Sequence, residues 1–381
     1  MRRVCALALC LATLGAPAFA ADPVKVGMIT TLSGPGGYLG EDMRDGFSLG
    51  AAGGTVPLQL LVEDDALKPG TAKQIAERML KTDKARIFTG TIFTNVFLAI
   101  APDLLEAGAT VLANVPAPNS YAGKDCEPGY FASGWDETLH ASAGELANRL
   151  GYKKIFLIAP NYQAGKEVIA AVKRMYKGEV AGELYTRLDQ TDFAAEIAQI
   201  RAAKPDALYQ FQPGGLGITF IKQYAQAGLN RDIPMVVASP SADARILAAV
   251  GDAALGMQVT VNWATGFENP ASRQFVSAFR EKYGREPTVY AAHGYDTARL
   301  IASALAASGN NPDAPAFRTA LAKADFPTVR GHFRFASNHG PVQDWYHVSV
   351  EPGADGRPAL TVKEKFMADA GGYLAEQCKM K

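Results

Sequence analysis

The sequence predicts an α/β protein with two lobes, each built on a sheet of mainly parallel strands. From Val24 onward, short apolar runs alternate with amphipathic segments, which is the pattern of strands covered by helices on both faces. The same alternation begins again after 125–140, a loop rich in glycine, proline and aspartate. A chain of 381 residues also has the length of two domains.

Individual elements follow from these apolar runs and their spacing. We expect strands at 24–30, 58–64, 86–90 and 110–114, and then at 153–160, 180–186, 206–212, 233–239 and 256–262. Helices are expected to begin near 40, 71, 94, 140, 164, 192, 215, 242 and 270. Two or three helices between 270 and 324 have no strands of their own, so they must pack on a sheet formed earlier. Residues 331–350 predict two strands around a Gly-Pro turn.

Residues 1–20 have the layout of a cleaved secretory signal. Two arginines precede an apolar stretch, and Ala18-Phe19-Ala20 is typical of a cleavage site. The apolar stretch is shorter than the roughly 20 residues of a membrane span. We therefore expect a soluble, exported protein that does not insert into a membrane.

Charge and cysteine content narrow the class of protein further. Without residues 1–20 the chain has 36 basic and 38 acidic side chains, which gives no basic surface for nucleic acid or anionic lipid. Cys126 and Cys378 are then the two remaining cysteines. In an oxidising compartment such a pair favours one disulfide over two buried free thiols, and the two residues make a poor zinc site.

The motifs of common enzymes are absent or incomplete. The glycines of "TLSGPGGYLGED" place Leu39 where a dinucleotide fingerprint needs its third glycine. "QPGGLGITF" has no lysine and hydroxyl directly after Gly217, as a phosphate loop requires. The five histidines form no metal-binding spacing, and no serine stands in a nucleophile motif. We expect neither cofactor, metal nor catalysis.

A small-molecule site is expected between the two lobes. Ligands of open α/β sheets bind at the carboxyl ends of the strands, and two such edges facing each other form a cleft. The stretch "LYQFQPGGLG" at 208–217 reads as a strand end and a turn, which would direct Gln210 and Gln212 towards that cleft.

The order of these features resembles the type I periplasmic solute-binding proteins of ABC transporters, in the branched-chain amino acid receptor branch. The resemblance runs over the whole mature chain and rests on "VKVGMITTLSGPGGYLGEDMRDGF", "VEDDALKPGTAKQIAERML", "ANVPAPNS", "NYQAGKE", "GDAALGMQVTV" and "PTVYAAHGYDTARL". It implies two lobes joined by a three-crossover hinge, with lobe 1 at 21–138 and 269–340, lobe 2 at 139–268, and a return to lobe 2 with a tail at 341–381. It also implies a periplasmic monomer that delivers a small solute to an inner-membrane permease.

The resemblance further implies the ligand contacts. Thr94 and Asn95 match the loop that presents a hydroxyl and backbone amides to a ligand carboxylate, at the start of a helix that favours an anion. Leu39 stands where the family places an aromatic ring, beside Tyr38. The other matching positions are Ala117, Pro118 and Asn119 in the loop after the fourth strand, Tyr162 and Ala164 in lobe 2, and Tyr290 in the cleft wall.

Two departures from the amino-acid receptors bear on the ligand. Those receptors have a threonine at the position of Asn119 and an acid in the loop that here begins with Ser239, and both help to hold the ligand ammonium. Asp243 is close enough in sequence to substitute for that acid. A carboxylate without an amine fits better, and Phe93, Phe211 and the tyrosines above supply aromatic walls. We expect an aromatic carboxylate of the benzoate or hydroxycinnamate type; the alternatives are an aliphatic amino acid or amide, and an exported hydrolase or amidase on the same scaffold.

Overall fold

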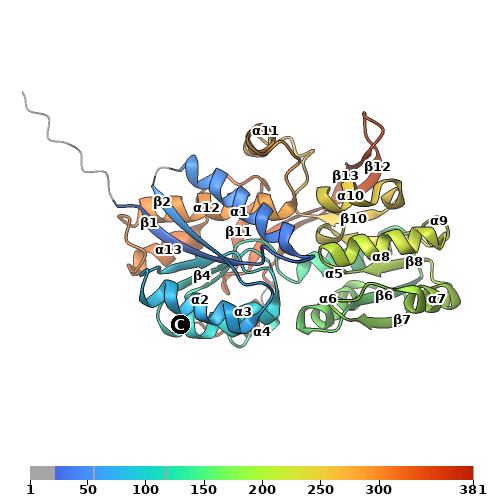
Figure 1. The fold of residues 1–381 in the computed structure, drawn as a ribbon, viewed down its shortest axis with the longest axis horizontal. Helices are drawn as coiled ribbons and strands as arrows, with labels where there is room; N and C mark the ends of the chain where they lie inside the picture. Colours follow the sequence, from blue (N-terminus) through green and yellow to red (C-terminus); the bar gives the residue numbers. More distant parts are fainter. Residues whose placement is uncertain (1–21, 55, 116–117, 381) are drawn as a thin grey trace, which may run out of the picture.

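The protein consists of two α/β lobes placed side by side along its long axis (Figure 1). The structure is a computed structural model that describes residues 22–54, 56–115 and 118–380. The predicted signal segment at 1–20 and the predicted contact Ala117 lie outside the described residues. Among the described helices, none is long and apolar enough to cross a membrane.

Lobe 1 is built on a parallel five-stranded sheet in the order β2-β1-β3-β4-β5. The carboxyl ends of its strands face the second lobe, where α3 and α4 begin (Figure 1). Its strands are β1 (Val24–Thr30), β2 (Leu58–Asp64), β3 (Ile87–Thr89), β4 (Thr110–Ala113) and β5 (Tyr130–Ala132), and its first helices are α1 (Gly37–Ala52), α2 (Pro69–Lys81), α3 (Thr94–Glu106) and α4 (Asn119–Ala122).

Three late helices follow most of the second lobe, and at least two of them, α12 and α13, pack on lobe 1. These are α11 (Pro270–Tyr283), α12 (Val289–Ala307) and α13 (Pro315–Lys323). Helix α12 lies against α1, and glycines allow this close approach, because a Cβ on Gly46 would overlap the carbonyl oxygen of Ala291. The prediction that the late helices return to an earlier sheet is confirmed for α12.

Lobe 2 has a three-stranded and a five-stranded sheet, linked by the parallel bridge between Leu208 and Met235. The strands of these two sheets are β6 (Lys154–Pro160), β7 (Glu179–Thr186), β8 (Ala207–Gln210), β9 (Val236–Ala238), β10 (Gln258–Val261), β11 (Phe333–Phe335), β12 (Pro341–Pro352) and β13 (Pro358–Gly371). Of these, β11 lies at the lobe 1 end of the second sheet, where Phe335 packs against Phe131 of β5. The helices are α5 (Thr138–Arg149), α6 (Gln163–Met175), α7 (Ala194–Ala203), α8 (Gly215–Gln226), α9 (Leu229–Asp232) and α10 (Ala244–Val250). Short 3₁₀ turns are η1 (Ser239–Ser241), η2 (Gly251–Ala254) and η3 (Ala375–Gln377).

The chain passes between the lobes three times. It first leaves β5 at 133–137 and enters α5, which packs on α6, β9 and β10 of lobe 2. It returns through 262–288, and it crosses again along β12, which pairs with β11 at one end and with β10 further on. The predicted α/β class with two lobes is confirmed. The predicted residue limits of each lobe stay predictions.

Two strands depart from the sequence expectation. The loop predicted at 125–140 contains the short strand β5, which pairs with β4 at the edge of the first sheet. The predicted tail contains the 14-residue strand β13, which runs antiparallel to β12.

Candidate functional site

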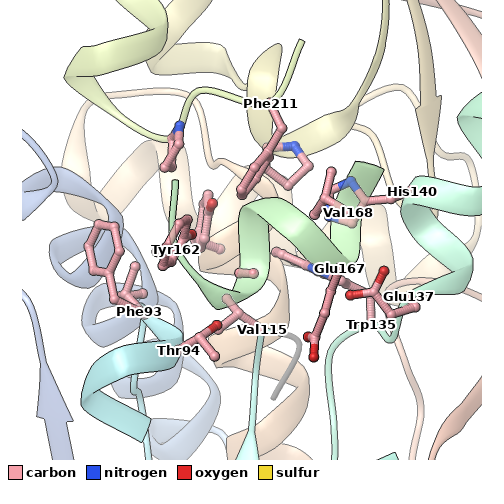
Figure 2. A pocket seen from close by; sticks show the side chains of 15 residues that line it. Phe93, Thr94, Val115, Trp135, Glu137, His140, Tyr162, Glu167, Val168 and Phe211 are labelled. Carbon is pink, nitrogen blue, oxygen red and sulfur yellow. The ribbon is translucent and has the colours of Figure 1, made fainter. Parts of the chain in front are cut away.

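A cavity of about 490 Å³, part of it open to solvent, lies between the lobes at the carboxyl ends of their strands. Residues of both lobes and of the first crossover line it (Figure 2). Its walls are formed by Ile92, Phe93, Thr94, Val115, Trp135, Glu137, His140, Tyr162, Ala164, Glu167, Val168, Phe211, Pro213, Pro240 and Tyr290.

Two helices of opposite lobes begin at this cavity. Helix α3 of lobe 1 starts at Thr94, and its N-cap residue is Phe93. Helix α6 of lobe 2 starts at Gln163, and its N-cap residue is Tyr162. Neither cap residue supplies a side-chain acceptor to its helix. An aromatic residue is a poor N-cap, so the first N–H groups of each helix keep their capacity to bind an acceptor. The positive ends of two helix dipoles therefore meet at the cavity.

Aromatic rings form much of the wall. Phe93, Trp135, Phe211 and Tyr290 are buried, and Tyr162 is half-buried. The rings of Trp135 and Tyr290 meet edge to face with centroids 5.7 Å apart. Burial raises the pKa of Tyr162 and of Tyr290 above the ordinary value, so both phenols stay protonated and can donate a hydrogen bond.

One side of the cavity carries two carboxyl groups. Glu137 is buried, and its Oε2 has no hydrogen-bond partner. Burial, followed by the nearby Glu167 and Asp136, raises the pKa of Glu137 to about 8. Glu167 accepts hydrogen bonds from the Asn119 backbone N–H at 3.2 Å and from the Gln163 side chain at 2.6 Å, and burial raises its pKa as well. Among the described residues that line this cavity, none is a lysine or an arginine.

A neutral histidine lies beside these acids. His140 is buried on α5, and burial lowers the pKa of its imidazole to about 3. Its Nδ1 lies 2.7 Å from the hydroxyl of Tyr209, and its ring meets Phe211 edge to face. At neutral pH the imidazole therefore brings no charge to balance Glu137. Among the described residues, no group of three or more His, Cys, Asp or Glu side chains is placed to hold a metal ion.

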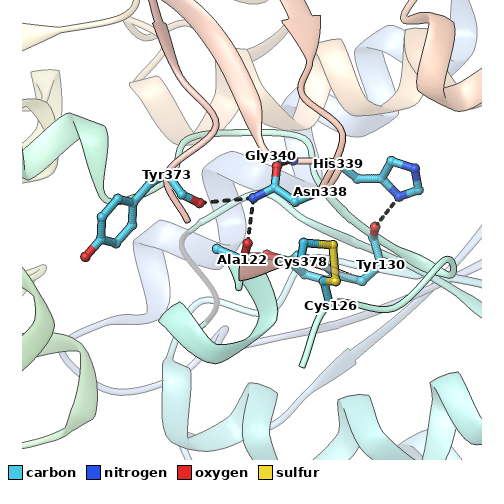
Figure 3. The surroundings of a disulfide bond; sticks show 8 residues. All are labelled: Ala122, Cys126, Tyr130, Asn338, His339, Gly340, Tyr373 and Cys378. Carbon is cyan, nitrogen blue, oxygen red and sulfur yellow. Dashed lines mark hydrogen bonds between the residues drawn. A yellow bond between two sulfur atoms is a disulfide. The ribbon is translucent and has the colours of Figure 1, made fainter. Parts of the chain in front are cut away.

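The first crossover, which carries Trp135 and Glu137, is held from behind by the C-terminal tail. Asp136 accepts a hydrogen bond from the Thr138 backbone N–H at the start of α5 and one from the Tyr373 backbone N–H at 3.1 Å. Asn338 donates from its Nδ2 to the carbonyl oxygens of Ala122 and Tyr373 (Figure 3).

A disulfide fixes the end of this tail. Cys126 and Cys378 are bonded, with their Cα atoms 5.6 Å apart, so the predicted disulfide is confirmed (Figure 3). It joins the loop before β5 to the residues after β13, across 252 positions of sequence. The tail is thereby tied to lobe 1 close to the crossover.

Direct contacts between the lobes border the cavity. The Tyr38 hydroxyl of α1 donates to Asp243 at the start of α10, at 2.9 Å. Arg245 donates from its Nη2 to Asp42 at 3.0 Å, and the Gly215 backbone N–H donates to the carbonyl oxygen of Pro35 at 3.0 Å. These bonds hold the lobes together around the cavity.

Six residues expected from the sequence line the cavity: Phe93, Thr94, Tyr162, Ala164, Phe211 and Tyr290. Asn119 lies next to it, since its backbone N–H bonds Glu167 and its side chain lines an adjoining hollow of about 290 Å³.

The other expected residues lie outside this lining. Tyr38 bonds Asp243, Leu39 is buried in the core, and Gln212 bonds Thr186. Asn95 and Pro118 occupy the starts of α3 and α4, Gln210 is buried with an unpartnered side-chain amide, and Ser239 lines a separate cavity of about 1160 Å³.

Sequence reasoning missed the acidic side of the cavity. Asp243, considered as a partner for a ligand ammonium, instead caps α10 and bonds Tyr38. The acids that line the cavity are Glu137 and Glu167. A signal for Glu137 was available, because residues of a crossover between two lobes necessarily border the space between them.

Comparison with known proteins identifies the family. A family model described as "Periplasmic binding protein" matches residues 23–357. The Leu/Ile/Val-binding protein homolog 6 of Brucella melitensis is 25% identical over 393 aligned positions, which cover 99% of this chain and 96% of that protein.

Two solved structures of ABC transporter solute-binding proteins are also similar to this chain. One, from R. palustris in complex with benzoate, is 26% identical with a TM-score of 0.85, over 94% of this chain and 100% of that chain. The other, from Rhodopseudomonas palustris BisB5 in complex with 3,4-dihydroxybenzoic acid, is 26% identical with a TM-score of 0.84. The match covers 92% of this chain and 98% of that chain. Because the family model spans most of the sequence, the chain belongs to the periplasmic binding protein family and is an ABC-type solute-binding protein of its branched-chain amino acid branch.

Proposed function

We propose that this protein binds a small aromatic carboxylate, of the benzoate or hydroxycinnamate type, between its lobes and delivers it to an inner-membrane ABC permease. The observation that carries this proposal is the meeting of two uncapped helix starts, α3 and α6, inside an aromatic cavity. Free N–H groups and dipole ends at a helix start bind anions without a lysine or arginine.

The ligand carboxylate is assigned to the side of Thr94. This residue is the first of α3, and Ala164 of α6 lines the same cavity from the other lobe. A ligand anion there would accept hydrogen bonds from both lobes at once. The role proposed for Thr94 and for the backbone N–H groups that follow it is the one that the sequence predicts.

The aromatic wall accounts for the rest of the ligand. Phe93, Trp135, Phe211 and Tyr290 present ring faces and edges to a planar guest, and such contacts are favourable beyond the area that they bury. The two similar structures described above were solved with benzoate and with 3,4-dihydroxybenzoic acid, which supports the same class of ligand here.

An aliphatic amino acid is the second candidate, and one observation favours it. Glu137 and Glu167 are acids that a ligand ammonium would bind. In Figure 2, however, Thr94 and Glu137 lie on opposite sides of the cavity. An α-amino acid carries its ammonium and carboxylate on the same carbon, so it fits this separation less well than a ring with polar groups at both ends.

Isothermal titration calorimetry of the purified protein tests the proposal. We expect binding of benzoate, 4-hydroxybenzoate or p-coumarate at micromolar concentration or tighter, and weak or no binding of leucine. The reverse ranking would favour the amino-acid alternative. Recovery of a chemically altered ligand after incubation, measured by mass spectrometry, would favour an exported hydrolase or amidase instead.

Location and assembly complete the proposal. We infer that the chain is exported by its first 20 residues and acts as a monomer in the periplasm. Export with loss of that segment is tested by N-terminal sequencing of protein from the periplasmic fraction, and the monomer by light scattering with and without ligand.

A further inference from the structure

We infer that Trp135 and Glu137 form a subsite for a hydroxyl group, so that the cavity selects aromatic acids that carry a phenolic hydroxyl away from the carboxylate. This inference rests on the proposed function, and it assigns the second polar group of the ligand. The subsite belongs to the first crossover, between β5 and α5.

Both residues line the cavity, and each has a buried polar atom without a hydrogen-bond partner among the described residues. Glu137 is 3% exposed, and its Oε2 has no hydrogen-bond partner. Trp135 is 2% exposed, and its indole Nε1 has no partner either. Buried polar atoms are almost always paired, because an unpaired one has lost its hydrogen bonds to water. Two of them, two positions apart in one segment, indicate a missing partner.

A hydroxyl is the group that satisfies both atoms. It donates one hydrogen bond and accepts another, so it can donate to the Glu137 oxygen while it accepts from the Trp135 N–H. An ammonium only donates and would leave the indole N–H unpaired. A second carboxylate only accepts and would stand beside two acids, Glu137 and Glu167.

The charged and titratable groups around Glu137 are consistent with a neutral partner. Glu167 and Arg174 face it from α6, and Asp136 precedes it in the crossover. Tyr162, Tyr209 and the neutral His140 are the other titratable groups near it. With a pKa of about 8, Glu137 is mainly protonated at pH 7, and a protonated carboxyl keeps one oxygen as an acceptor.

The placement of the two residues agrees with a ligand that is polar at both ends. Figure 2 shows Phe93 and Thr94 on one side of the cavity, and Glu137 and His140 on the other. A benzene ring with a carboxylate and a distant hydroxyl has this shape. Trp135 and Glu137 also border the adjoining hollow of about 290 Å³, and the alternative is that their free atoms serve water held there.

Calorimetry with matched ligands and variants tests the inference. The ligands are 4-hydroxybenzoate, benzoate and 4-methylbenzoate, and the variants are Glu137→Met and Trp135→Phe. The matched control is Glu145→Met, which makes the same change on α5 at a residue outside the cavity lining. Circular dichroism and thermal unfolding establish that each variant is folded.

We expect wild type and the control to bind 4-hydroxybenzoate at least about tenfold more tightly than benzoate, the size expected for hydrogen bonds to a buried site. Each of the two subsite variants should reduce that preference to less than about threefold, whatever its effect on the affinity for benzoate itself. A Glu137→Gln variant keeps an acceptor oxygen of the same reach and should retain most of the preference.

Each failure has a separate meaning. The hydroxyl subsite would be overturned if wild type bound benzoate and 4-hydroxybenzoate equally, or if both variants kept the preference of wild type. Neither result would contradict the proposal that the ligand is an aromatic acid. Binding of none of the aromatic acids would overturn the proposed function itself.

Discussion

Replacement of Glu137 by glutamine is expected to change how stability depends on pH. Burial, with Glu167 and Asp136 nearby, raises the pKa of this carboxyl from 4.5 to about 8 in the folded protein. Between these two values the unfolded chain has lost the proton while the folded protein keeps it. The free energy of unfolding should therefore fall as pH rises from about 4.5 to about 8, because a raised carboxyl pKa favours the folded state only at low pH.

The size of this effect follows from the same two values. A separation of one pH unit corresponds to about 1.4 kcal/mol, so at pH 7 the buried proton of Glu137 costs about 3 kcal/mol of stability relative to low pH. The glutamine variant carries no such cost. Its stability relative to wild type should improve by up to about 3 kcal/mol between pH 5 and pH 7.

Urea unfolding at pH 5, 6, 7 and 8 measures the difference between the two proteins. Groups elsewhere in the chain titrate in both proteins and largely cancel in that difference. Glu145→Gln on the following helix α5 is the control, because it makes the same change at a partly solvated position outside the cavity lining. Parallel curves for wild type and Glu137→Gln would refute the reasoning, since they would mean that Glu137 ionises in the fold as it does in the unfolded chain.

Three further perturbations test other parts of the site. Thr94→Val should weaken aromatic acid binding by about 1 to 3 kcal/mol in calorimetry, the cost of an unmade hydrogen bond to a charge; unchanged affinity would remove Thr94 from the site. Tyr38→Phe removes the bond to Asp243 between the lobes and should weaken ligand binding by about 1 kcal/mol, roughly fivefold, although neither residue lines the cavity. Serine at both Cys126 and Cys378 should lower the unfolding free energy by about 3 to 5 kcal/mol, and added reductant should lower that of wild type to the same level.

The sequence predicted the framework of the fold because its strands have a simple signal. Strands β1 and β2 match the predicted ranges, since apolar runs bounded by turns locate the buried strands of a parallel sheet. Strand β13 has no such signal. It carries charged residues such as Lys363 and Glu364, and it lies at the edge of its sheet, where pairing with β12 determines the backbone.

The site was predictable to the extent that it follows the family pattern. Phe93, Thr94 and Tyr162 stand where strands end and helices begin, and a motif at such a point locates the residue in space. Trp135 and Glu137 belong to a crossover without periodicity, so their meeting with Glu167 depends on how the two lobes close. The packing of the two lobes brings these residues together, and no local sequence pattern predicts it.

The proposed ligand contacts would link specificity to the way in which the two lobes pack against each other. Closing brings the uncapped starts of α3 and α6 to one cavity, where two positive dipole ends face each other, and it leaves Glu137 with an unpartnered oxygen. The contacts of Tyr38 with Asp243 and of Arg245 with Asp42 join the lobes through residues outside the cavity lining. A ligand with an anion at one end and a hydroxyl at the other would balance the two helix dipoles and would give the Glu137 oxygen a hydrogen-bond partner. An acid without the hydroxyl would balance the dipoles but leave the Glu137 oxygen unpaired. Closure of the lobes should therefore be less complete with benzoate than with 4-hydroxybenzoate. A permease that recognises the closed form would then receive the hydroxylated acid in preference.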